Sequence, residues 1–349
     1  MTAQRGTSAF SNRKTLPAAL MAETVHGLSR LHHLRPEFDE LAQRCQLPAT
    51  ASTTWVFTTL AVTESTTPWA ILVRDQQGTL RGALVLIDQP DNQVRLAGTD
   101  EGHRGAIAAE GTDVAELLAE ELGRTLRSRP AHPTVVLGPL DARDVATQIF
   151  SAALPTSTLM QDDSIPIVAK DTNVLTHYLS QGMRRTVRKA HNRLAKDGRE
   201  WSVDFITSPR EIQELLPKLE RCHRDRDHVH GRASDLDDDY TRLLWQARIE
   251  ALATNGQLEL ATLSIDGLFA AHALGILDRP TYRILEGRFV TEWARYSPGR
   301  LLESVILERA IHDTTYTTLD WMTAVAPDKL LATNEADPMV LVCLQATPD

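Results

Sequence analysis

The sequence predicts an α+β protein made of two similar halves, each with a mixed, mostly antiparallel sheet and helices on its faces. Strand–turn–strand patterns alternate with amphipathic helical patterns along the chain. The length of 349 residues suits two domains. The same order of helix, hairpin, further strand, helix and strand occurs twice, which indicates a tandem duplication.

The first half is predicted to be a domain at residues 26–168, after a flexible arm at residues 1–25 that shows no clear hydrophobic period. A helix is expected from Pro36, because proline suits the first helical turn. The apolar runs on either side of Asp75–Gly78 predict a hairpin. The other expected elements are a strand at 94–97, a helix at 114–126 and a strand at 134–137.

The second half is predicted to be a domain at residues 169–349. Two prolines and several polar residues in 155–172 mark the border. Helical patterns cover 174–197, and Gly198 is a suitable residue to end them. The later expected elements are a strand at 201–206, helices at 209–226 and 239–254, three strands between 258 and 289, a helix at 300–312, and short strands at 318–322 and 339–344.

Composition excludes several classes of protein. The net charge of −9 argues against broad binding of nucleic acid, which needs clustered cations. Three scattered cysteines without CxxC spacing indicate a reducing compartment. Neither a secretory signal nor an apolar run of membrane-spanning length is visible. We therefore expect a cytoplasmic protein that does not associate with membranes.

The turn at Tyr296–Arg300 lies between a predicted strand and a predicted helix. A helix N-terminus offers unpaired N–H groups and the positive end of the helix dipole, which suit a phosphate. Gly299 permits close approach of a ligand, and Pro298 presets the turn. The alternative is an ordinary loop that caps a structural helix.

This turn and other parts of the second half resemble the GNAT superfamily of N-acyltransferases, in particular its CelD-type and FemAB-like branch with tandem GNAT domains. The matching residues are Tyr178-Leu179, Arg184-Arg185, Arg188, Arg193-Leu194, Gly198, Gly256–Leu260, Ile265–Gly267, Tyr296–Leu302, Leu319–Trp321 and Lys329. The resemblance covers residues 170–345. Residues 30–165 match only as the N-terminal half that is expected of this tandem branch. Tyr296, Leu301 and the loop at 322–328 depart from the usual pattern.

The resemblance implies transfer of an acyl group from a coenzyme A or acyl-carrier-protein thioester to an amine, without a metal. It places the acyl-CoA co-substrate on Arg295, Tyr296, Ser297, Gly299, Arg300 and Leu301. The first domain is expected to be a degenerate copy, since it has no equivalent turn with basic support. The alternatives are an aminoacyl-tRNA-dependent peptide-bond-forming transferase of the Fem type and a non-catalytic binding protein with a GNAT fold.

The first candidate for the general base is Glu286, on the strand before the turn. If it points inward, burial is expected to raise its pKa. A surface glutamate paired with Arg283 or Arg288 is the alternative. The second candidate is His272, which lies among apolar residues and could equally be a core histidine.

Two further residues are weaker catalytic candidates. Tyr282 would be a general acid for the departing thiolate, or else a packed aromatic. Asp320 would orient the amine or Lys329, or else be structural at a strand end.

The residues expected to contact substrate are Arg184, Arg188 and Lys329. The two arginines belong to a basic helical face that fits donor phosphates, an acidic carrier protein or transfer RNA, unless it is simply a solvated surface. The amine acceptor is expected to be a small molecule or a peptide. Cys222, His223, His228 and His230 have metal-like residue types, but their spacing fits no strong zinc signature.

Overall fold

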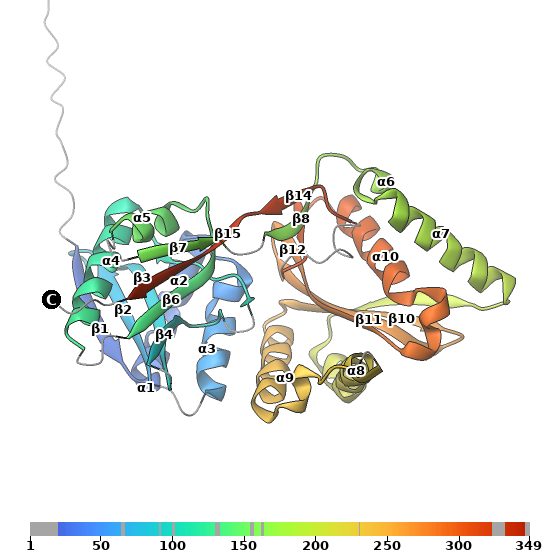
Figure 1. Cartoon of the computed structure of the whole chain (residues 1–349), viewed down its shortest axis with the longest axis horizontal. Coiled ribbons are helices and arrows are strands. Elements are labelled where there is room, and N and C mark those ends of the chain that lie inside the picture. The colour runs from blue at the N-terminus through green and yellow to red at the C-terminus, as the bar shows by residue number, and fades with distance from the viewer. Residues whose placement is uncertain are drawn as a thin grey trace, which may run out of the picture.

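The computed structural model describes residues 20–63, 67–90, 92–99, 102–129, 133–153, 157–161, 164–229, 231–322 and 332–345. They form two sheets side by side, each with helices on both faces (Figure 1). The first sheet has the order β1-β2-β3-β4-β6-β15-β7, with β5 paired to β3. The second has the order β14-β8-β13-β12-β11-β10-β9. The predicted α+β fold of two similar halves is confirmed.

The first domain is built around an antiparallel meander. Its elements are β1 (Met21–His26), α1 (Leu28–His33), α2 (Arg35–Arg44), α3 (Thr53–Val62), β2 (Pro68–Arg74), β3 (Leu80–Gln89), β4 (Gln93–Leu96), β5 (Ala108–Ala109), α4 (Thr112–Arg127), β6 (Thr134–Asp141), α5 (Val145–Ala153) and β7 (Ser157–Gln161). The predicted hairpin is β2–β3. Alternate residues of β2 face opposite ways, so Ile71 packs with α4 and Leu72 packs with α1–α3.

The second domain repeats this plan. Its elements are β8 (Ile165–Ala169), α6 (Leu175–Tyr178), α7 (Gln181–Lys196), β9 (Trp201–Ile206), α8 (Pro209–Val229), α9 (Asp239–Thr254), β10 (Leu258–Ile265), β11 (Leu268–Asp278), β12 (Thr281–Phe289), α10 (Pro298–His312), β13 (Thr318–Asp320) and β14 (Glu335–Asp337). The last strand, β15 (Met339–Gln345), joins the first sheet. Helices α6, α7 and α10 share a core on one face of the sheet. Helices α8 and α9 share a core on the other face.

Each domain contains one parallel strand pair joined by a helix. In the first, β4 pairs with β6 and α4 connects them. In the second, β12 pairs with β13 and α10 connects them, but only residues 281–283 of β12 have partners on β13. Among the described residues the remainder of β12 has no partner on this side, and α10 begins beyond that end of the strand.

The sheets do not follow the boundaries expected from the sequence. Strand β1 begins at Met21, inside the segment predicted to be a flexible arm. Strand β15 lies in the segment assigned to the second domain, yet it pairs with β6 and β7 in the first sheet. The chain thus crosses to the second sheet at β8 and returns to the first at its last strand (Figure 1).

The two domains meet where α3 packs on α9. Arg248 of α9 is 3% exposed, and its guanidinium lies 4.0 Å from the centroid of the Trp55 ring. Its Nη2 donates to Thr59 Oγ1 at 2.9 Å. Trp55 also belongs to the same apolar cluster as Leu252 and Leu260, so the core of the second domain continues into the first.

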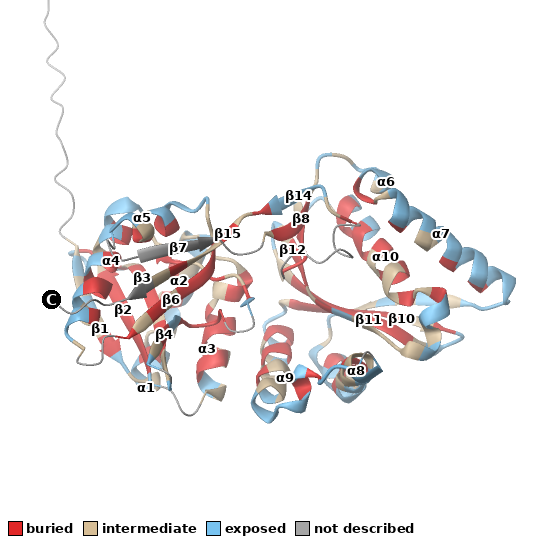
Figure 2. Ribbon diagram, viewed as in Figure 1, coloured by how far each residue is buried: buried red, intermediate tan, exposed pale blue. Residues whose placement is uncertain are grey.

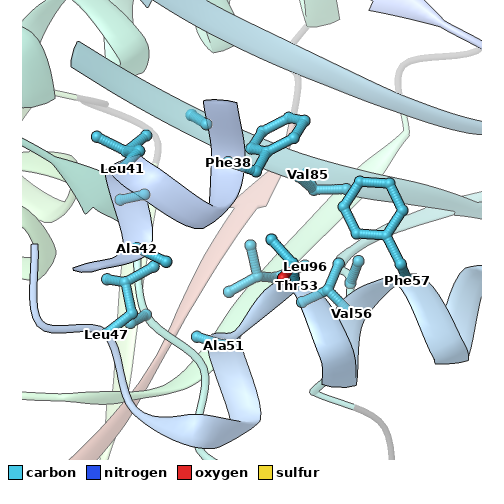
Figure 3. Close-up of a pocket in the computed structure, with 14 residues that line it drawn as sticks. Phe38, Leu41, Ala42, Leu47, Ala51, Thr53, Val56, Phe57, Val85 and Leu96 are labelled. Carbon is cyan, nitrogen blue, oxygen red and sulfur yellow. The ribbon is translucent and has the colours of Figure 1, made fainter. Parts of the chain in front are cut away.

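Buried residues line the sheets and the inward sides of the helices (Figure 2). One apolar cavity remains between α2, α3 and the first sheet (Figure 3). Phe38, Leu41, Val56 and Phe57 are among its lining residues, and no charged side chain lines it. It therefore offers no group for acid–base chemistry.

The position of β15 predicts that a change close to the C-terminus destabilises the first domain. Val342 is fully buried in the core under α4 and α5. Val342→Asp would bury an unpaired carboxylate, and we expect it to lower the free energy of unfolding by more than about 3 kcal/mol. Urea unfolding followed by tryptophan fluorescence measures this, since Trp69 lies in the same core. The control is Val174→Asp at a position 46% exposed; equal stability of the two variants would contradict the pairing of β15.

Candidate active site

The turn expected to bind phosphate precedes α10. Residues 291–296 form a 3-10 helix, Ser297 has a left-handed conformation (φ 50°, ψ 50°), and Pro298 occupies the first turn of α10. The first helical hydrogen bond runs from Leu301 N to Ser297 O (3.1 Å), so the N–H of Gly299 precedes the bonded part of the helix. The Ser297 side chain makes no capping hydrogen bond. The geometry is that of a helix start open to an anion.

Other residues of this turn are engaged within the protein. The Tyr296 hydroxyl donates to Asp197 Oδ2 at 2.8 Å, and Arg295 pairs with the same carboxylate at 2.8 Å. Arg300 pairs with Glu303 at 2.6 Å, and Leu301 is fully buried in the core. These four residues hold the turn in place, and Ser297 N donates to Ala294 O at 3.0 Å. The N–H of Gly299 is therefore the backbone group of the turn that we consider for a ligand.

Glu286 lies inward on β12, at the centre of a buried polar cluster. The register pairs Leu274 with Glu286 and Gly275 with Ile284, so Leu285 is an extra residue in β12. Such a bulge changes the direction of nearby side chains. Glu286 Oε1 lies 3.1 Å from His272 Nε2, and its Oε2 accepts from Trp245 Nε1 at 2.9 Å.

His223 of α8 is the fourth member of this carboxylate–histidine cluster (Glu286, His272, His223 and Trp245). Its Nδ1 lies 3.0 Å from Glu286 Oε2, and Arg288 Nη2 lies 3.0 Å from its Nε2. A guanidinium can only donate, so Nε2 of His223 accepts, and Nδ1 lies on the side of Glu286. The histidine thus bridges a cation and an anion.

The sequence analysis did not assign a role to His223 or Trp245. A signal for His223 was present: it continues the buried stripe of Leu216 and Leu219 on α8 at helical spacing. A polar residue on such a stripe needs a buried partner, and Glu286 supplies it.

The prediction that burial raises the pKa of Glu286 is wrong in its net sign. Burial does act to raise the pKa, but hydrogen bonds from His223 and His272 and the charge of Arg288 outweigh it. The pKa of Glu286 lies well below its usual value, so the carboxylate is ionised near neutral pH. Cys222 next to this cluster remains a thiol, because burial and the Glu286 charge raise its pKa to about 12.

Tyr282 and Asp320 have structural partners. The Tyr282 hydroxyl donates to Glu259 Oε1 at 3.0 Å, and burial followed by the Glu259 charge raises its pKa well above the usual value. Asp320 is 1% exposed, pairs with Arg283 and accepts from Met322 N at 2.6 Å. The geometry favours the packing alternative for Tyr282 and the structural alternative for Asp320.

Two of the three residues expected to contact substrate, Arg184 and Arg188, are not brought to the cluster. Arg184 and Arg188 are exposed on α7, on the opposite side of the sheet. Lys329 lies outside the described residues. Within the described ranges, no group of three or more His, Cys, Asp or Glu side chains is placed to hold a metal.

A cavity of about 470 Å³ opens between the domains. Its walls come from the first domain, including Cys45, Arg104 and Asp144, together with Arg283 of β12. Arg283 precedes Glu286 on the same strand, so the cavity borders the strand that carries the cluster. No helix in the described part of the chain is both long and apolar enough to cross a bilayer.

The lowered pKa of Glu286 predicts acid sensitivity. Its carboxylate stabilises the fold fully above the unfolded pKa near 4.5, and this contribution is lost as pH falls toward the folded pKa. We expect Glu286→Gln to make the melting temperature less dependent on pH between about pH 5 and 3. The control is Glu292→Gln at an exposed position. If the melting temperature of the Glu286 variant depended on pH as steeply as that of the wild type, the buried carboxylate would not be charged.

Comparison with known proteins identifies a family domain in part of the chain. Residues 181–330 match the profile of the acetyltransferase (GNAT) domain. No curated protein matches the sequence significantly. The structure of FemX is similar with a TM-score of 0.66 at 13% identity, covering 93% of this chain and 98% of FemX.

Two further solved structures share the fold. The C-terminal domain of a putative lysylphosphatidylglycerol synthetase from Agrobacterium fabrum has a TM-score of 0.54 at 13% identity, with 88% of this chain and 92% of that chain covered. The L-PGS structure from Bacillus licheniformis has a TM-score of 0.54 at 10% identity, with 90% and 92% covered. This chain therefore carries a GNAT-superfamily domain in residues 181–330, within a fold of two tandem GNAT-like domains.

Proposed function

We propose that the protein is an N-acyltransferase that moves an acyl group from a coenzyme A or carrier-protein thioester to an amine. One observation carries the proposal: β12 connects the two parts of the candidate site. Glu286 lies near the end of β12, and Phe289 ends that strand with its ring 3.4 Å from the place a Cβ on Gly299 would take. The acid–base cluster and the proposed anion-binding helix start are thus linked through the end of one strand.

In the proposed reaction, the neutral amine attacks the thioester carbonyl carbon, the C–S bond breaks and the sulfur leaves as a thiolate. The proton released from the amine passes to His272, whose Nε2–H is held by the ionised Glu286. His272 Nδ1 is buried and has no hydrogen-bond partner among the described residues, so its lone pair is not used by another group of the cluster. A protonated histidine then returns the proton to the thiolate.

The acceptor side of the proposal rests on the interdomain cavity. Arg283 reaches it from β12, and the cluster-bearing face of the second sheet is the one that meets the first domain. We propose that a small-molecule or peptide amine enters there. The cytoplasm remains the predicted location.

The second candidate function is aminoacyl transfer from transfer RNA, as implied by the resemblance to Fem-type enzymes. The likeness to FemX extends over both domains, which favours it. The exposed cations of α7 would then contact RNA phosphates, and binding would weaken steeply with salt.

Donor binding at the helix start predicts stabilisation by ligand. Acetyl-CoA at one hundred times its Kd is expected to stabilise the protein by about 2.7 kcal/mol. Gly299→Leu would fill the approach to the helix N-terminus and abolish this stabilisation by acetyl-CoA. Gly299→Ala is the control, because its Cβ makes only an ordinary 3.4 Å contact with Phe289. Differential scanning fluorimetry with a series of acyl-CoA thioesters measures the shift; no stabilisation of the wild type by any of them would sink the coenzyme A proposal.

The cluster predicts a kinetic phenotype. Glu286→Gln removes the charge that orients His272, and we expect kcat to fall about 10²–10⁴-fold while the shift caused by acyl-CoA persists. Thiol release monitored by a chromogenic disulfide measures the rate. Unchanged kcat in this variant would remove the cluster from the mechanism.

A further inference from the structure

Helix α7 carries a cationic strip, defined here as Arg184, Arg185, Arg188, Lys189 and Lys196. All five side chains are exposed, and α7 contains no acidic residue. Within the described part of the chain, none of the five forms an ion pair with a carboxylate. Figure 2 shows α7 as mostly exposed, at the edge of the molecule distant from the first domain.

The strip works against the stability of its own helix. Arg184 and Arg188 are four residues apart, as are Arg185 and Lys189, and such like-charged pairs destabilise a helix by a few tenths of a kcal/mol each. Two of the cations also lie near the N-terminus, where the helix dipole disfavours positive charge. Lys196 in the last turn suits the helix dipole, but the four cations between Arg184 and Lys189 do not serve the helix itself, which points to a partner outside the chain.

A lipid surface is a poor match for the strip. The apolar side of α7, with Met183, Ala190 and Leu194, is already buried in the core. The outward side has no large exposed apolar residue among those described. A helix that lies in a membrane interface needs both cations and an exposed apolar face.

The strip leads to the proposed donor site. Arg193 Nη1 donates to Arg295 O at 2.5 Å, so the last turns of α7 contact the segment just before α10. A helix of 16 residues is about 24 Å long. A macromolecule docked along α7 would therefore place a flexible phosphate-bearing arm close to the N–H groups at the start of α10.

We infer that the strip docks an acidic carrier protein, which delivers the acyl group as a phosphopantetheine thioester. This rests on the proposed function and specifies its donor. The exposed cations are confined to one helix and complement an acidic partner of similar size. The net charge of −9 of the whole chain argues against broad contact with nucleic acid.

The experiment compares one charge-reversal variant with a matched control. Arg185→Glu, Lys189→Glu and Lys196→Glu are combined in the test variant. Arg30→Glu, Arg95→Glu and Arg127→Glu, at exposed positions of the first domain, make the same change in net charge in the control. The probes are a purified fatty-acid acyl carrier protein in its acylated form, acetyl-CoA, and total transfer RNA. Binding is measured by isothermal titration calorimetry at two salt concentrations, and turnover is measured with each thioester.

We expect the wild type and the control to bind the carrier protein and to use its acyl group. The test variant should bind it at least about tenfold more weakly, because several charge contacts are reversed, while its turnover of acetyl-CoA is unchanged. The inference would be overturned if all three proteins bound the carrier equally or if the wild type did not bind it. It would also be overturned if the test variant lost binding of RNA and not of the carrier. Failure of the wild type to use any thioester would instead overturn the proposed function.

Discussion

The pairing of the last strand with the first sheet is the constraint on which the arrangement of this protein depends. Strand β15 lies between β6 and β7, while β14, immediately before it, pairs with β8 in the second sheet. Asp337 at the end of β14 also binds Arg104 and Arg143 of the first domain. Separation of the domains would break these ion pairs, and the chain is held in the second sheet at β14 and in the first sheet at β15, with Pro338 alone between them.

The same constraint explains why a buried charge is tolerated at Glu286. A lone carboxylate in a core is strongly unfavourable, but this one receives hydrogen bonds from two other elements, β11 and α9, and has His223 of α8 beside it. Helix α9 is itself fixed against the first domain through Arg248 and Trp55. The first domain therefore contributes to the electrostatics of the site without supplying one of the cluster's residues.

Much of the fold could be predicted from local patterns. The predictions that failed depend mostly on contacts between distant parts of the sequence. Periodicity located α4, α7 and β10–β12, whereas α3 was missed because Trp55 to Leu60 are almost uniformly buried and show no polar face. The strand at 339–345 was expected, but nothing in its sequence specifies which sheet it joins. Glu286 was identified as a candidate, yet the direction of its pKa shift depends on His223, sixty-three positions away, and could not be read from neighbouring residues.

The two faces of the second sheet have different chemistry, and this division suggests how two substrates meet. The face with α7 and α10 presents cations and an open helix start, both suited to an anionic donor. The opposite face presents the carboxylate–histidine cluster and borders the interdomain cavity. Among the described residues, β12 pairs with β13 only from Thr281 to Arg283. The features suited to an anionic donor and the acid–base cluster therefore lie on opposite faces of the sheet, and β12 links them through Phe289 and Glu286.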